Sequence, residues 1–245
     1  MAGLRGLGYV EGKNVVIEFR WAQTKNDRLP ELAEELVRLK PDVLVTHGAP
    51  GALAAKRATM TQLQLVSERG AQGEVGRVYA EIRETLGISF VPNFFKTLAN
   101  SPTALRATWE AYRNNSWRGT IPTVLKEMMF VAISTARDCR YCEIAHLAFC
   151  KQLGADEGTR RSLVENLDTL APRRSGDVIR FAVKAAMTPA AIDSTDYKLL
   201  HDHGISDAEV AEILAMTAFS MYATTLADSL HLSVDAEFEQ ILAAT

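Results

Sequence analysis

The sequence contains little of what marks several common protein classes. Only three of its 245 residues are cysteine, and an odd number of cysteines does not suggest a disulfide framework. The net charge of −3 at pH 7 leaves no general basic field for a nucleic-acid backbone. No apolar run approaches the ~20 residues of a membrane span, and the first residues lack the apolar core of a signal peptide. We therefore expect a cytoplasmic protein with no nucleic-acid partner and no membrane span.

Residues 1–59 differ in pattern from the rest of the chain. Alternating β-branched residues predict a strand over 14–21, helical spacing predicts a helix over 29–39, and the apolar run 41–46 is typical of a buried parallel strand. Together they predict a small βαβ fragment. The blocks LRGLGYVEGKNVVIEFRWA and DRLPELAEELVRLKPDVLVTHGAPGALAAKRAT resemble part of an ABC transporter substrate-binding protein over residues 3–59. Too few strands are present for a two-lobed ligand clamp, so ligand binding by this fragment is the weaker alternative function.

From residue 60 onward the apolar spacing is helical, with no strand pattern. Boundary residues such as Ser101-Pro102, Gly154 and Thr188-Pro189 separate the segments. Helices are predicted over 78–86, 94–98, 102–112, 122–135, 139–153, 157–166, 176–187, 194–203 and 207–230. We expect an all-α domain over 60–245. Residues 1–59 are interpreted as a fusion ahead of a separate protein that starts near Met60, with a natural two-domain protein as the alternative.

One group of residues carries recognisable chemistry, with the spacing Glu127-x11-Cys139-x2-Cys142-x3-His146. Asp138 is a candidate N-cap, which would place Cys139 in the first turn of a helix, where backbone N–H groups stabilise a thiolate. Residues three and four apart share a helix face, so Cys142 lies beside both Cys139 and His146. An imidazole moves protons near neutral pH, and a helical hairpin would return Glu127 to it. The pattern predicts a nucleophile, a base and an orienting carboxylate.

Other interpretations of these residues were weighed. Cys139, Cys142, His146 and Cys150 share a helix face, which suggests zinc, but one helix cannot surround an ion tetrahedrally and no second Cys/His cluster is present. Free cysteines also serve as small buried apolar residues, and this is the preferred interpretation of Cys150. A single histidine is more often a core residue than a catalyst, so His146 gains its significance only from the joint spacing. We predict no metal and no cofactor.

Two further blocks carry a family resemblance. NFFKTLANSPTALRATWEAYRNN and IPTVLKEMMFVAISTARDCRYCEIAHLAFCKQLG resemble the AhpD-like alkylhydroperoxidases of the carboxymuconolactone decarboxylase-like group, especially its peroxidase-related proteins. The segment GDVIRFAVKAAMTPAAIDSTDYKLLHDHGISDAEVAEILAMTAFSMYATTLADSL resembles the C-terminal half of the same set. The resemblance covers roughly residues 78–232 and implies an all-α homo-oligomer with a redox-active CxxC.

The resemblance also implies an activity and residue roles. Cys139 and Cys142 would be the dithiol, His146 the proton shuttle and Glu127 its carboxylate partner. The implied activity is thiol-dependent reduction of a hydroperoxide, or disulfide reduction, with a thiol or dithiol donor such as a peroxiredoxin partner. The sequence does not decide which cysteine attacks first. A carboxymuconolactone decarboxylase-like lyase acting on a small acid or lactone is the alternative.

The sequence departs from the resembling family between the two cysteines. Well-studied members have a second histidine next to the second cysteine, where this chain has Tyr141. A neutral phenol with a pKa near ~10 shuttles protons poorly at pH 7. We therefore interpret Tyr141 as a residue that covers the thiols.

Overall fold

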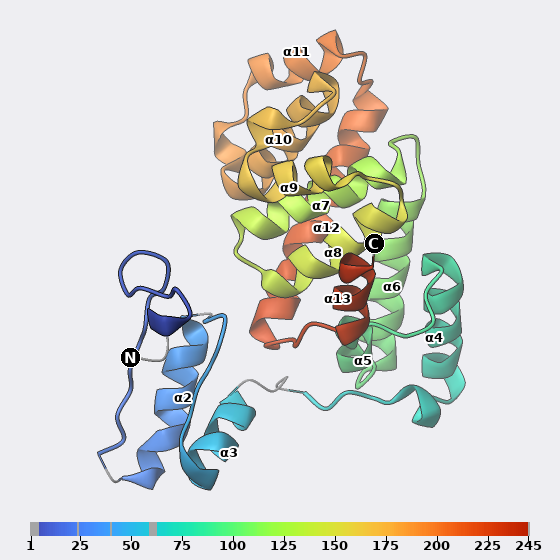
Figure 1. The fold of residues 1–245 in the computed structure, drawn as a ribbon. Coiled ribbons are helices and arrows are strands. Elements are labelled where there is room, and N and C mark those ends of the chain that lie inside the picture. The colour runs from blue at the N-terminus through green and yellow to red at the C-terminus, as the bar shows by residue number, and fades with distance from the viewer. Residues whose placement is uncertain (1–4, 24, 40, 59–62, 245) are drawn as a thin grey trace. The chain divides into compact units, whose positions relative to one another are not determined.

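The computed structural model describes residues 5–23, 25–39, 41–58 and 63–244 (Figure 1). The chain divides into two compact units, Met1–Met60 and Thr61–Thr245. Each unit has buried apolar side chains of its own, few in the first and many in the second.

The first unit is built on two packed helices. After the short 3-10 helix η1 (Asn26–Arg28) come α2 (Leu29–Arg38) and α3 (Gly48–Ala58). Proline is favoured in the first turn of a helix because the N–H it lacks has no intrahelical partner there, and Pro30 occupies that turn of α2. Leu32 and Ala33 of α2 and Ala54 of α3 are buried, so the predicted helix and its apolar face are present.

The βαβ prediction is wrong. Neither 14–21 nor 41–46 forms a strand, and the described part of this unit contains one isolated bridge, between Glu11 and Val15. Val16 and Val45 are 80% and 83% exposed. A two-stranded pair is marginally stable in water, and two short helices offer too little apolar surface to cover both faces of a parallel pair. The segments 14–21 and 41–46 therefore lack the tertiary contacts that a sheet needs, although their residues suit a strand.

The second unit is all α in its described part, 63–244, as predicted. Its α-helices are α4 (Gly73–Leu86), α5 (Asn93–Leu98), α6 (Pro102–Trp117), α7 (Thr123–Ala136), α8 (Arg140–Gln152), α9 (Glu157–Glu165), α10 (Arg173–Met187), α11 (Ser194–Asp202), α12 (Asp207–Ser229) and α13 (Ala236–Ala243). Short 3-10 helices lie at η2 (Glu68–Gly70), η3 (Leu167–Thr169) and η4 (Pro189–Ala191).

Helix α7 forms the centre of this unit. Every residue from 125 to 134 is buried, because α8, α10 and α12 pack around it. A helix surrounded on all sides needs apolar residues on all sides, which explains the sequence LKEMMFVAIS without a polar stripe. The two charged residues in that stretch, Lys126 and Glu127, must therefore find partners inside the protein.

Helix α12 is long and apolar enough to cross a membrane by length and composition alone. Its burial inside the second unit offers another explanation for its apolar composition. Half of its most apolar window is buried inside the second unit, against α6, α7, α8 and α10. Such burial is what the central helix of a globular domain requires.

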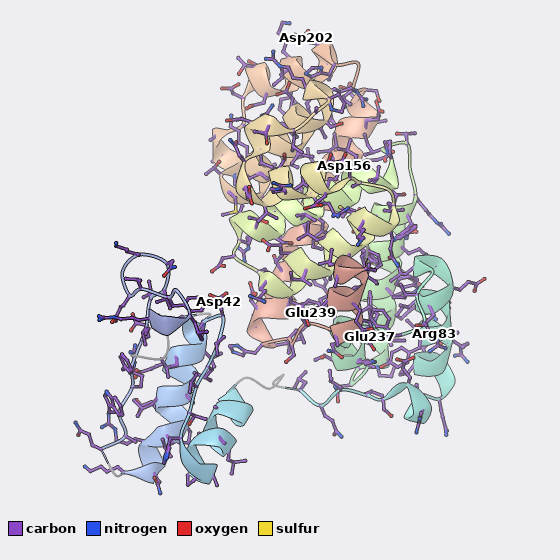
Figure 2. The ribbon with its side chains drawn as sticks, viewed as in Figure 1. Asp42, Arg83, Asp156, Asp202, Glu237 and Glu239 are labelled. Atoms are coloured by element: carbon purple, nitrogen blue, oxygen red, sulfur yellow. The ribbon has the colours of Figure 1, made fainter. Side chains whose placement is uncertain are left out.

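Several helices begin or end at residues other than those predicted. Helix α4 begins at Gly73, five residues before 78, and α6 continues to Trp117, five residues past 112. Helix α9 begins where predicted, because the carboxylate of Asp156, which is labelled in Figure 2, accepts a hydrogen bond from the Thr159 N–H. Helix α13 was not predicted; it packs against α8, as Figure 1 shows, through the buried Phe238.

Candidate active site

The α7–α8 hairpin brings together the residues that the sequence singled out. Helix α7 ends at Ala136, and Asp138 takes a left-handed conformation with φ 57°. The Cys139 N–H then donates to the Ser134 carbonyl, a bond that closes the helix end. The prediction that Asp138 is the N-cap of α8 is therefore wrong, because Asp138 reverses the chain instead. Aspartate tolerates this left-handed conformation better than most residues. Cys139 takes the N-cap position.

Glu127 and His146 are paired inside the protein, as the hairpin prediction requires. Nδ1 of His146 lies 2.5 Å from Oε2 of Glu127, and the carboxylate is fully buried. A carboxylate accepts, so Nδ1 is the protonated nitrogen of this pair and Nε2 is available as the base. The imidazole ring also stacks on Phe130, with ring centroids 3.4 Å apart. The ring is thereby fixed in both its tautomer and its plane.

Tyr112 supplies a contact that the sequence did not reveal. Its hydroxyl donates to Oε1 of Glu127 at 3.2 Å, so both carboxylate oxygens have partners. From the sequence, Tyr112 is an apolar helix-face residue of the core or of a subunit interface. It is buried, but its hydroxyl lies at the site because α6 packs against α7. Burial raises the pKa of Tyr112 well above its usual value, so it acts here as a proton-bearing donor.

The two thiols of the CxxC pair lie together in the reduced form. Cys139 and Cys142 are both free and buried. A hydrogen bond with the Cys139 side chain, followed by burial, raises the pKa of the Cys142 thiol well above its ordinary value. The Cys139 Sγ–H donates to the Thr224 carbonyl of α12 at 3.9 Å. Cys142 is therefore a neutral thiol at rest and needs a base to become a nucleophile.

A cavity of about 40 Å³ lies beside these groups. A single buried water needs only ~10–15 Å³, so the space admits a small reacting group. Cys142, His146, Tyr141 and Tyr112 contribute polar side chains to its wall, whereas Cys139 is not among the lining residues. The rest of the wall is apolar and mostly aromatic, including Phe94, Phe95, Phe130, Phe149, Phe219 and Phe238.

Tyr141 does not merely cover the thiols, because two hydrogen bonds anchor its hydroxyl. Its ring lines the cavity, and its hydroxyl donates to Oδ2 of Asp235 at 2.9 Å and accepts from the Phe94 N–H at 3.0 Å. Asp235 is 3% exposed and immediately precedes α13. Sequence reasoning missed this pair, since 94 positions separate its members and no local pattern connects them.

Cys150 lies apart from the CxxC pair and is fully buried. Burial, followed by the nearby Glu127 charge, raises the pKa of its thiol well above the ordinary value. Within 5–23, 25–39, 41–58 and 63–244, no group of three or more His, Cys, Asp or Glu side chains is arranged to hold a metal ion.

Comparison with known protein families gives one match. Residues 102–188 match the carboxymuconolactone decarboxylase family. This segment is therefore similar to that family over about a third of the chain. The matched segment contains Glu127, Cys139, Cys142 and His146, whereas Asp235 lies outside it. A search of curated proteins finds no match.

Solved structures with the same fold extend the likeness beyond the matched segment. One is the AhpD core of an uncharacterized peroxidase-related protein from Ralstonia eutropha JMP134, at TM-score 0.67 and 25% identity, covering 73% of this chain and 94% of that one. Another is a peroxidase-related protein from Silicibacter sp. TM1040, at TM-score 0.66 and 26% identity, covering 73% and 93%. The debrominase Bmp8 shares the fold at TM-score 0.63 and 19% identity, covering 73% and 94%. The all-α unit therefore has the AhpD-like fold.

Proposed function

We propose that the protein reduces hydroperoxides with the Cys139–Cys142 dithiol, using His146 and Glu127 to move protons. The observation that carries this proposal is the juxtaposition of a reduced thiol pair with a buried Glu127–His146 pair at one small cavity. Because Cys142 lines the cavity and Cys139 does not, Cys142 is the thiol that meets the peroxide.

The chemistry runs in two steps with a balanced transfer of two electrons. His146 Nε2 takes the Cys142 proton, and the thiolate attacks the terminal oxygen of ROOH. The O–O bond breaks, the alkoxide leaves as ROH with the proton from His146, and Cys142 becomes a sulfenic acid. The Cys139 sulfur then attacks that of Cys142, forming the disulfide and releasing water. Glu127 stabilises the imidazolium between the two proton transfers.

An external donor must complete the cycle. Thiol–disulfide exchange with a thiol or dithiol, a peroxiredoxin among the candidates, returns the pair to the reduced form and oxidises the donor. The same exchange run on a partner's disulfide would make the protein a disulfide reductase.

The wall of the cavity favours an uncharged substrate over an acid. A lyase of the carboxymuconolactone decarboxylase type would bind a carboxylate, which usually requires a cationic side chain. Lysine and arginine are absent from the lining residues that the structure describes. An alkyl hydroperoxide carries no charge at neutral pH and requires only a few polar groups beside an apolar wall.

Cysteine variants test the proposal in single-turnover reactions with tert-butyl hydroperoxide. The reduced protein is expected to lose two hydrogen atoms in mass as one disulfide forms. Cys139→Ser should stop at a Cys142 sulfenic acid that dimedone captures, because the second sulfur is missing. Cys142→Ser should show neither adduct nor peroxide consumption.

Cys150→Ala is the matched control, since it removes a buried thiol outside the pair, and its turnover should equal that of the unaltered protein. Peroxide consumption by Cys142→Ser at the normal rate would refute the proposal. Lactone substrates and 2,3,4-tribromopyrrole, the compound found in complex with a variant of the debrominase Bmp8, are offered in parallel. Turnover of either of these without hydroperoxide reduction would assign the site to a lyase or a dehalogenase instead.

A further inference from the structure

Three segments that are far apart in sequence meet at the Asp235 carboxylate. Oδ1 accepts from the Asn93 N–H at the start of α5 at 2.9 Å, and Oδ2 accepts from the Tyr141 hydroxyl in the first turn of α8. The Asn93 side chain in turn donates to the Ser233 carbonyl, two residues before Asp235. The CxxC turn, Cys139 to Cys142, is thereby connected to two other segments that contribute residues to the cavity wall. These residues are Phe94 of α5 and Phe238 of α13.

The burial of Asp235 is unfavourable for its charged form. The carboxyl is nearly inaccessible to water, and burial raises its pKa to about 6 despite the hydrogen bonds that favour ionisation. The charged or titratable groups around it are Tyr141 on α8, Lys96 on α5 and Glu237 on α13, the last marked in Figure 2. Lys96 is itself paired with Glu68. Burial of the charged form therefore costs free energy at neutral pH, so a functional reason for a carboxylate is expected.

We propose that Asp235 is a positioning residue of the dithiol site, acting through the Tyr141 hydroxyl to hold the CxxC turn and the cavity wall in their reactive arrangement. Ionised Asp235 accepts charge-assisted hydrogen bonds from Tyr141 and Asn93, and these are roughly twice as strong as neutral ones. Protonated Asp235 holds Tyr141 more weakly, and Tyr141 directly precedes Cys142. The reactivity of the dithiol therefore falls as the medium becomes acidic enough to protonate Asp235.

This inference rests on the proposed function for the identity of the substrate. Its test also works with an oxidant that is not a peroxide. Reduced protein is oxidised in single turnovers between pH 5 and 8 with tert-butyl hydroperoxide and, separately, with diamide, which oxidises dithiols without peroxide chemistry. Asp235→Asn should slow disulfide formation roughly tenfold at pH 7.5, less than the ~100-fold that a 1 Å misplacement of a reacting group can cost. It should also abolish the part of the pH profile centred near 6, while any contribution of His146 persists in both proteins.

Tyr141→Phe keeps the carboxylate but removes its connection to the CxxC turn, so it should slow the reaction to the same extent. The double variant should be no slower than either single variant, because both remove one interaction. Tyr79→Phe is the matched control, since it removes a buried hydroxyl whose partner is the Val66 carbonyl, away from the cavity. Its rates and pH profile should be unchanged.

Two results would overturn the inference: an unaltered rate and pH profile in Asp235→Asn, or losses in the two single variants that multiply in the double. If Asp235→Asn does not fold, Tyr141→Phe, which removes a single oxygen atom, tests the inference instead. The readouts are again the rate of disulfide formation and its pH profile. If the unaltered protein reacts with diamide but not with the hydroperoxide, the proposed function fails, and the diamide rates still decide the role of Asp235.

Discussion

Glu127 shows how a single buried charge is made tolerable and useful. A carboxylate without water is costly unless its oxygens accept hydrogen bonds, and here one oxygen has His146 and the other Tyr112. The same contacts that stabilise the charge also hold the imidazole in one tautomer. Stability and the proposed proton transfer therefore depend on the same few atoms.

Removing one of those contacts should affect both properties. Tyr112→Phe deletes only the hydroxyl and leaves Oε1 of Glu127 buried without its donor, which is expected to cost about 1–3 kcal/mol of unfolding free energy. Disulfide formation with tert-butyl hydroperoxide should slow as well, because Glu127 is less firmly held against His146. Urea denaturation and single-turnover kinetics measure the two effects, and a variant equal to the unaltered protein in both would show that the Tyr112 contact is dispensable.

At the scale of elements, α7 is joined to its neighbours by a second buried charge. The Lys126 ammonium is 1% exposed and lies 3.0 Å from Oε2 of Glu212 on α12. The same carboxylate accepts hydrogen bonds from the N–H groups of Thr120 and Ile121 in the loop before α7. Gly119, with φ 94°, makes room for it, since a Cβ there would lie 2.2 Å from Oε2. One side chain thus connects α12, α7 and the α6–α7 loop.

Glu212→Gln should destabilise the second unit strongly at neutral pH, because it leaves the buried Lys126 charge unmatched, a change that typically costs about 3–5 kcal/mol. Burial would raise the pKa of Glu212, but the hydrogen bonds from Thr120, Ile121 and Lys126 lower it from 4.5 to about 2. Since the native pKa lies below the unfolded one, this stabilisation is present above pH 4.5 and is lost as pH falls toward 2. Urea midpoints of the two proteins should therefore differ most near pH 7 and converge near pH 2; a constant difference would contradict the assignment.

The sequence predicted those elements and contacts that are local. Apolar spacing located each α-helix between 78 and 230, and the Glu127–His146 pair followed from a hairpin that places neighbouring helices face to face. Contacts between distant segments were invisible, because nothing near Asp235 indicates that Tyr141 will be its partner. The strands expected at 14–21 and 41–46 failed for the same reason, since strand formation depends on partners elsewhere in the chain.

On the scale of the whole molecule, the two units differ in how completely they bury their apolar residues. The second unit has a large continuous apolar core, and this unit also contains the cavity and every residue assigned to the proposed reaction. The described part of the first unit leaves Val16, Trp21, Val43 and Val45 exposed. Exposed apolar groups of this kind favour association rather than catalysis.

A chain without residues 1–60 should therefore retain its chemistry. Single-turnover oxidation by tert-butyl hydroperoxide is expected to match that of the full chain within about twofold, because the described contacts of Cys139, Tyr141, His146 and Glu127 are made with residues of Thr61–Thr245. Light scattering of the shortened chain should fall, because exposed apolar side chains, Val16, Trp21, Val43 and Val45 among them, are removed. A loss of dithiol reactivity, with the helical circular dichroism signal unchanged, would instead make the first unit part of the working enzyme and would contradict its interpretation as a fused segment.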